Sequence, residues 1–299
     1  MARFIQSEQY IISLFKLGHQ FDFGGRQYTV KRVGKPRPSE GECKTDVYIA
    51  ATDNQEHTIE IKISIKQTNA NFIENKISLE RAIEIFGDDA QKIIATATSG
   101  IKDSFDADYL ICIDNYRRTK AGSFKLGWKF ELLNKVSGDK SGLLTLSDSQ
   151  KIGIFSGDNL SEAKRNCKVC GEVIPNSGVA NYILEYDGSE ISLQQCLDSI
   201  VPIAEYAQRQ NIYFACKALN YRIYADKWDG DRPLAVYVDW SVKDGKLHGE
   251  IVYHCPLEVR GNSVGERLKA CLQELGIAKG NFNELLSYTD KNMKIYKKI

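Results

Sequence analysis

The segment His57–Gln67 carries the most regular pattern in the chain, and it constrains the fold more than any other segment. Isoleucine alternates with polar residues throughout it: Ile59, Ile61, Ile63 and Ile65 fall on one face, and Glu60, Lys62, Ser64 and Lys66 fall on the other. A period of two with β-branched residues at every second position is typical of a strand that buries one face. The segment is therefore predicted to be a β-strand with one buried and one polar face.

The elements around this strand are predicted from periodicity and turn residues. In chain order they are a helix over 3–17, strands over 26–33 and 45–51, the strand over 57–67, one or two helices over 72–98 that break near Gly87, and strands over 107–114 and 123–134. Up to residue 114 the order is helix, three strands, helix, strand. The strand over 107–114 is an apolar run bounded by charge, which is typical of a central strand.

The second half of the chain begins after a stretch rich in Gly, Ser, Asp and Lys, over 135–166. It is predicted to contain a helix over 192–209, a hairpin of strands 234–240 and 247–255 joined through Asp244-Gly245, and a helix over 264–275. We expect two domains, over 1–140 and 141–299.

Composition excludes several classes of protein. The 299 residues are 42% hydrophobic and 26% charged, which excludes a largely disordered chain. Lys and Arg number 40 against 39 Asp and Glu, so the chain is not polybasic, although a nucleic-acid enzyme can still concentrate positive charge in one cleft. No stretch is long and apolar enough to cross a bilayer, and the N-terminus turns polar too early for a signal peptide. A cytoplasmic protein without membrane contact is expected.

An acidic residue and a lysine occupy a characteristic pair of places in the predicted hairpin. Asp46 lies where the chain enters one strand, and the next strand presents Ser64 and Lys66, or Glu60 and Lys62, on its polar face. This arrangement, in this order of elements, resembles the PD-(D/E)xK nuclease superfamily and within it the type II restriction endonucleases. The resemblance covers about residues 1 to 115. It implies an α/β restriction-endonuclease-like core, with a mixed central sheet flanked by helices, and leaves a second α+β domain.

Two frames fit the motif, Glu60-Ile-Lys62 and Ser64-Ile-Lys66. A turn centred on residues 54 and 55 places Asp46 opposite residue 63, so Ser64 and Lys66 lie closest across the strand pair. The polar run Gln67–Asn71 also resembles restriction enzymes in which an uncharged residue replaces the second acid. Glu60 remains a candidate metal ligand and Lys62 the alternative lysine.

The resemblance implies phosphodiester hydrolysis that depends on Mg²⁺. Mg²⁺ prefers oxygen ligands, and Asp46 is the first candidate, joined by a main-chain carbonyl near Ile65. Glu60 on the strand or Glu8 on the first helix could complete the site, and Glu40 and Glu42 lie just upstream of Asp46. Lys66 would orient the attacking water or stabilise the charge on the phosphate.

Two of the eight cysteines have the spacing of metal ligands. Cys167-Lys-Val-Cys170 looks like one half of a structural zinc site, which needs four ligands. The other ligands would have to come from a scattered set, namely Cys196, Cys216, Cys255, His248 and His254. The alternative is a tight turn with two reduced thiols.

The sequence therefore predicts a Mg²⁺-dependent, sequence-specific endonuclease that cuts double-stranded DNA as a homodimer. The second domain would help to read the sequence, with Arg260 and Asn262 suited to base edges. Three alternatives stay open. They are a repair or junction-resolving nuclease, a catalytically inactive DNA-binding protein in which Ser64 replaces an acid, and a zinc-braced interaction protein.

Overall fold

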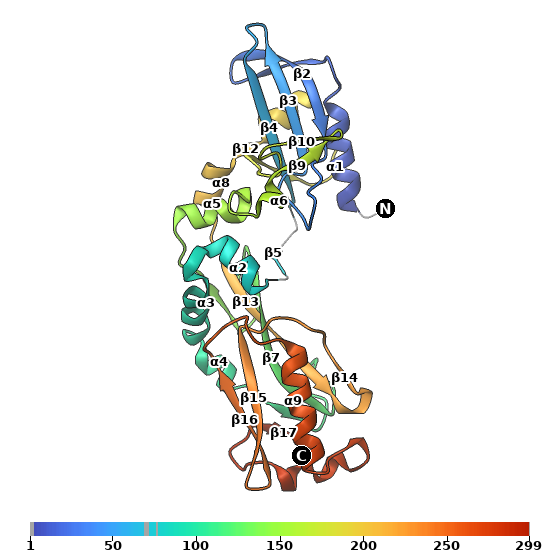
Figure 1. The fold of residues 1–299 in the computed structure, drawn as a ribbon, viewed down its shortest axis with the longest axis vertical. Coiled ribbons are helices and arrows are strands. Elements are labelled where there is room, and N and C mark those ends of the chain that lie inside the picture. Colours follow the sequence, from blue (N-terminus) through green and yellow to red (C-terminus); the bar gives the residue numbers. More distant parts are fainter. Residues whose placement is uncertain (1–2, 69–71, 76, 299) are drawn as a thin grey trace. The chain divides into compact units, whose positions relative to one another are not determined.

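The computed structural model describes residues 3–68, 72–75 and 77–298, and the chain is a mixed α/β protein. It divides into two compact units, each made of two stretches of chain. Unit 1 comprises Met1–Asn71 and Thr145–Gln210, and unit 2 comprises Phe72–Leu144 and Asn211–Ile299. The expected division into 1–140 and 141–299 does not describe these units, because the chain leaves unit 1 after its first strands and later returns to it. Figure 1 follows this path by colour.

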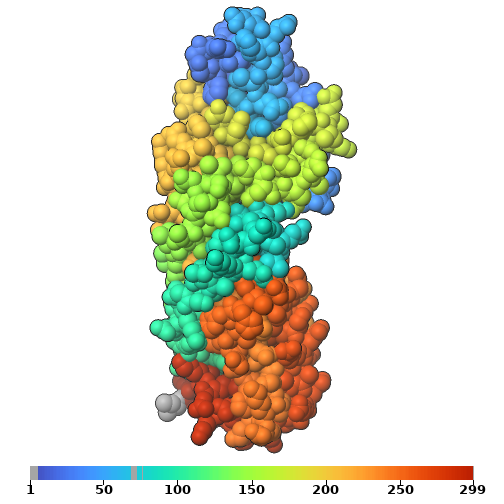
Figure 2. Space-filling view, turned by 60° about the vertical axis from the view of Figure 1, so that its left-hand side comes forward, coloured from blue at the N-terminus to red at the C-terminus, as the bar shows by residue number. Residues whose placement is uncertain are grey.

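Unit 1 is built on one six-stranded sheet of order β1-β2-β3-β4-β11-β12. Its strands are β1 Gln20–Phe23, β2 Arg26–Gly34, β3 Val47–Asp53, β4 Thr58–Gln67, β11 Tyr182–Tyr186 and β12 Val201–Pro202. Neighbouring strands are antiparallel except for β4 and β11, which are parallel. In Figure 2 the yellow-green and yellow segments of the second stretch lie against the blue segments of the first.

The isoleucine face of β4 is buried, as the alternation predicts. Ile61, Ile63 and Ile65 share a core with Ile11 of α1 (Arg3–Leu14) and with Phe15, which directly follows this helix. Cys196 and Leu197 of α7 (Leu193–Ser199) join the same core. The predicted helix over 3–17 is thus present but ends at Leu14.

The remaining elements of unit 1 come from its second stretch. They are α5 (Asp148–Ser156), α6 (Glu162–Arg165), the hairpin of β9 (Cys167–Val169) and β10 (Glu172–Ile174), and α8 (Ile203–Arg209). The single helix predicted over 192–209 is wrong, because β12 separates α7 from α8. Ile200 is extended, with ψ 138°, and the following Pro202 has no amide hydrogen to continue a helix.

Unit 2 contains a nine-stranded sheet whose main path is β14-β13-β7-β15-β16. These strands are β14 Lys227–Trp228, β13 Tyr213–Arg222, β7 Ser123–Leu133, β15 Val236–Lys243 and β16 Lys246–Val252, and the short strands beside them are β5 Phe72–Glu74, β6 Ile111–Cys112, β8 Ser141–Leu143 and β17 Ile295–Tyr296. Its helices are α2 Leu79–Phe86, η1 Gly87–Asp89, α3 Ala90–Ser99, α4 Lys102–Asp106, η2 Ile223–Ala225, α9 Gly261–Glu274 and η3 Lys279–Tyr288. Trp128, Trp240 and Phe124 are fully buried and anchor its core.

Some predictions in unit 2 are confirmed and others are wrong. The hairpin β15–β16 turns at Asp244-Gly245, where both residues have positive φ. The predicted helices break at Gly87, with φ 74°, but they begin at Leu79, and Phe72–Glu74 at the start of the predicted span forms the strand β5. The run 107–114 forms only β6, which pairs with β7 and β17 and is no part of the sheet of unit 1. The strand that pairs with β4 on the side away from β3 is β11.

No helix among the described residues is long and apolar enough to cross a membrane.

Candidate active site at the end of strand β4

Asp46 directly precedes β3, where this strand begins beside the last residues of β4. Its main-chain N–H donates to the carbonyl of Ile63 at 2.8 Å, and Val47 pairs with Ile63. Continuing this register puts Asp46 opposite Ser64, one residue further along β4 than the predicted position. The shift arises at the turn, since Thr52 pairs with Thr58 and the turn therefore centres on residue 55.

At the end of the β3–β4 pairing, the Asp46 carboxylate accepts a main-chain hydrogen bond from β4. The N–H of Ile65 donates to its Oδ2 at 2.7 Å. Burial raises the pKa of Asp46 to about 6, and the Ile65 N–H and the charge of Lys66 oppose that rise. Glu8 raises this pKa further and Lys35 lowers it. The carboxylate is therefore held in place by the backbone, within the electrostatic reach of two cations and one other acid.

Glu8 reaches this position from α1. Its side chain is buried, 3% exposed, and it forms an ion pair with Lys35 in the loop after β2. The structure thus brings the predicted helix acid into the electrostatic neighbourhood of Asp46. The part of Lys35 was missed, because the spacing of an irregular loop gives no signal of what its side chains approach.

Ser64 and Lys66 lie on the polar face of β4, as predicted. Ser64 is 1% exposed, and Lys66 is half-buried. On the other side of β4, Ile183 and Glu185 of β11 are their registered neighbours. Of the polar run Gln67–Asn71, residues 69–71 lie outside the described residues.

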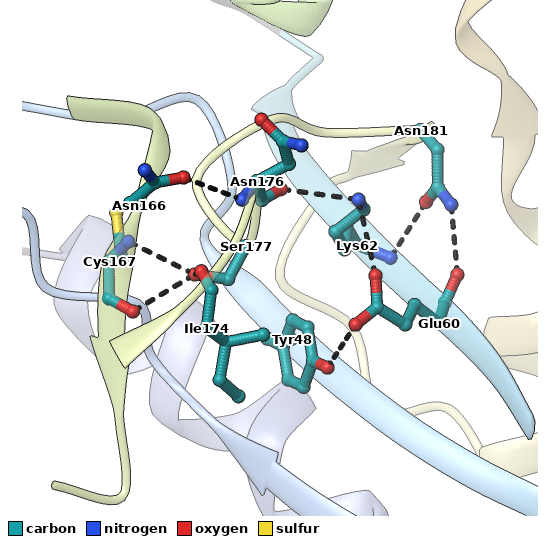
Figure 3. A network of polar contacts seen from close by, with 9 residues as sticks. All are labelled: Tyr48, Glu60, Lys62, Asn166, Cys167, Ile174, Asn176, Ser177 and Asn181. Carbon is teal, nitrogen blue, oxygen red and sulfur yellow. Dashed lines mark hydrogen bonds and ion pairs between the residues drawn. The ribbon is translucent and has the colours of Figure 1, made fainter. Parts of the chain in front are cut away.

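The alternative pair, Glu60 and Lys62, belongs to a different set of contacts (Figure 3). Glu60 accepts a hydrogen bond from the Tyr48 hydroxyl, and Lys62 Nζ lies 3.4 Å from Glu60 Oε2. Lys62 Nζ also donates to the main-chain carbonyl of Asn176 at 3.2 Å. Burial and the neighbouring Glu60 raise the pKa of Tyr48. These side chains satisfy one another in the middle of the strand, which favours the frame of Ser64 and Lys66 at its end.

The cysteine pair does not lie in a metal-binding arrangement. Cys167 is buried and hydrogen-bonds with Cys43, whereas Cys170 is exposed and points its thiol at the carbonyl of Val33, 3.3 Å away. In the described part of the chain no three His, Cys, Asp or Glu side chains are grouped to hold a metal ion. The geometry favours the alternative interpretation, a tight turn between β9 and β10 with reduced thiols.

The two residues expected to read bases have partners within unit 2. Arg260 Nε donates to Asp231 Oδ2 at 2.7 Å, and Asn262 Oδ1 accepts from Trp228 Nε1 at 2.6 Å. Upstream of Asp46, Glu40 and Glu42 are exposed, and Glu40 Oε1 lies 3.4 Å from the Ser161 hydroxyl.

The oxygen donors around Asp46 suit Mg²⁺. Asp46 and Glu8 offer carboxylate oxygens, and the end of β4 adds main-chain carbonyls. The Cys43 thiol also lies within electrostatic reach of Asp46, and burial raises the pKa of this thiol to about 12, so it stays protonated. Mg²⁺ is commonly bound by one or two carboxylates, while water and substrate phosphates supply the remaining ligands. Burial raises the pKa of Asp46 and so disfavours its ionised form, and a bound cation would stabilise that ionised form.

No protein-family model, no curated protein and no solved structure matches this chain, so the functional conclusion rests on its own residues.

Proposed function

We propose that unit 1 is a Mg²⁺-dependent endonuclease that hydrolyses phosphodiester bonds in double-stranded DNA, as type II restriction enzymes do. The observation that carries the proposal is the Asp46 carboxylate, anchored on the Ile65 N–H at the end of β4 and influenced by the charge of Lys66. A carboxylate and a lysine within electrostatic reach of each other are what the proposed reaction needs.

The arrangement of unit 1 supports the same proposal. One helix precedes four antiparallel strands, β1 to β4, and a later strand, β11, adds to β4 in parallel. A restriction-endonuclease-like core would use β11 as its later strand in place of the predicted strand over 107–114, and unit 2 is formed partly by the chain between β4 and β11. A parallel neighbour requires a crossover, which is where a long insertion can be accommodated.

Each residue has a distinct part in the proposed reaction. Asp46 would hold the metal ion, with Glu8 and a carbonyl near Ile65 as further oxygen donors. Bound Mg²⁺ polarises the phosphate and makes a water more acidic. The Lys66 ammonium would stabilise the negative charge that grows on the phosphate during attack. Lys35 neutralises Glu8, so that two carboxylates can lie close together.

The proposed partners follow from this activity. The substrate is double-stranded DNA, unit 2 contributes to its recognition, and the chain acts as a homodimer because two copies can cut both strands of a symmetric site. Such an enzyme would meet foreign DNA in the cytoplasm.

Cleavage of unmethylated phage DNA tests the proposal, with and without Mg²⁺. The wild-type protein should give discrete Mg²⁺-dependent fragments, and Asp46→Ala and Lys66→Ala should abolish them. Asp22→Asn and Lys16→Ala are matched controls, because both residues are exposed in unit 1. They should cut like the wild type.

The outcomes separate the alternatives. A smear in place of discrete bands would indicate a repair or junction-resolving nuclease. A folded wild-type protein that retards DNA on a gel without cutting it would contradict the catalytic proposal and indicate a DNA-binding protein.

A further inference from the structure

A second carboxylate lies beside Lys66, on the neighbouring strand that the chain contributes late. Strands β4 and β11 run parallel, and their register pairs Glu185 with Lys66. Registered residues of parallel strands share one face of the sheet, and adjacent strands lie about 4.8 Å apart. Glu185 is therefore the nearest β11 neighbour of Lys66 on its polar face.

Glu185 is held in place by helix α8. The Tyr206 hydroxyl donates to Glu185 Oε1 at 2.9 Å. The Tyr206 ring in turn packs edge-on against Phe155 of α5, with 5.2 Å between ring centroids and an interplanar angle of 88°. Burial and the Glu185 charge raise the pKa of Tyr206, so its hydroxyl stays protonated as the donor. An exposed glutamate would otherwise sample many rotamers, and this hydrogen bond restricts it.

Lys66 consequently lies between two acids on its two neighbouring strands. Asp46 lies on the β3 side, and the charge of Lys66 lowers its pKa. Glu185 lies on the β11 side. A lysine side chain loses rotamer freedom when it is fixed, and a second anchored charge reduces the number of orientations left to fix.

We propose that Glu185, anchored by Tyr206, is a positioning residue that holds the Lys66 ammonium toward the reacting phosphate. The inference rests on the proposed function of unit 1 and adds a residue to it. Glu185 acts through Lys66 and touches neither metal nor substrate. Its effect should therefore appear in the rate of the cleavage step and not in DNA or metal binding.

The test compares Glu185→Gln with the wild type under single-turnover conditions. Glutamine keeps the size of the side chain and an acceptor for Tyr206, so the fold should be retained. We expect the cleavage rate constant to fall at least tenfold, while the Kd for DNA and the Mg²⁺ concentration for half-maximal rate stay within twofold. Glu185→Asp should restore part of the rate, and Tyr206→Phe should lower it a fewfold.

Glu205→Gln provides the control, since Glu205 adjoins Tyr206 on α8 but is exposed and paired with Arg209. It should cut at the wild-type rate. If the wild type cuts DNA and Glu185→Gln cuts as fast, this inference alone is wrong. A shift in the Mg²⁺ requirement of Glu185→Gln would contradict the positioning role and make Glu185 a metal ligand. A wild-type protein that never cuts would refute the proposed function and this inference together.

Discussion

Asp46 is partly buried and lies near another acid, and both properties lower the stability of the folded protein when Asp46 is ionised. It is a carboxylate at the buried end of a strand ladder, and it lies near a second carboxylate, Glu8. Its pKa of about 6 lies above the ordinary value of 3.8. The folded state therefore binds the proton more tightly than the unfolded state, and ionisation lowers stability as the pH rises between those two values.

Replacing Asp46 by Asn should consequently stabilise the protein while it abolishes cleavage. Asparagine can still accept from the Ile65 N–H but carries no charge. We expect the free energy of unfolding at pH 8 to rise by about 1–3 kcal/mol, and the gain to shrink toward zero at pH 4, where Asp46 is protonated in the folded wild type. Urea unfolding at the two pH values measures this. A loss of stability at pH 8 would contradict the account.

Replacing each of the two lysines of β4, Lys62 and Lys66, should show which of them is needed for cleavage. Lys62→Met removes the contacts with Glu60 and the carbonyl of Asn176, and should cost about 0.5–1.5 kcal/mol while cleavage continues. Lys66→Met should abolish cleavage in a protein that still unfolds cooperatively in urea. Urea unfolding and the DNA assay on both variants test the pair. The reverse pattern would move the site to the frame of Glu60 and Lys62.

At the scale of elements, one side chain joins β4 to the segment that leads into β11. Asn181 accepts from the Lys62 main-chain N–H at 2.7 Å, and it donates to the Glu60 carbonyl at 2.9 Å (Figure 3). The amide thus continues the ladder one residue before β11 begins at Tyr182. It fixes the register that places Glu185 beside Lys66.

Asn181→Ala should destabilise unit 1 by roughly 1–3 kcal/mol, because it leaves two main-chain groups of β4 without their side-chain partner. Gln194→Ala, at an exposed position of α7, should change stability by less than about 0.5 kcal/mol. Thermal unfolding of both variants gives the comparison. Equal effects would show that the Asn181 bonds add no specific stability.

Sequence patterns predict those elements whose neighbours are close in the chain. The alternation of β4 and the Asp-Gly turn of β15–β16 are local signals, and both predictions are confirmed. Residues 110–113 of the apolar run 107–114 are buried, yet one of the partners of this run comes from the tail: the N–H of Leu110 bonds to the carbonyl of Lys294. A local pattern carries no information about which distant strand a segment joins.

The same limit applies to the site. Asp46, Ser64 and Lys66 share one hairpin, so their proximity could be predicted to within one residue of register. Glu8 was predicted as an alternative only, because its place depends on how α1 packs. Glu185 could not be found, since residues 72–144 separate β4 from the second stretch of unit 1.

At the scale of the whole molecule, each unit is assembled from two stretches of chain. Strand β11 and helices α7 and α8 all follow the stretch that belongs to unit 2. Unit 1 therefore needs its second stretch, Thr145–Gln210, to be complete. Without β11 from this stretch, β4 would have an unpaired edge.

A fragment of residues 1–140, the domain that the sequence suggested, should consequently not fold by itself. It lacks β11 and the α7 residues Cys196 and Leu197 of the unit 1 core. Circular dichroism should show no cooperative thermal transition for the fragment, whereas the full chain should show one. A cooperative transition in the fragment would contradict the division into units.

The most direct test of the central claim is cleavage of unmethylated DNA by the wild type and by Asp46→Asn, each with and without Mg²⁺. Because the variant should be at least as stable as the wild type at pH 8, lost activity cannot be ascribed to unfolding. We expect discrete Mg²⁺-dependent fragments from the wild type and intact DNA with Asp46→Asn. Equal cleavage by both proteins, or no cleavage by a folded wild type, would contradict it.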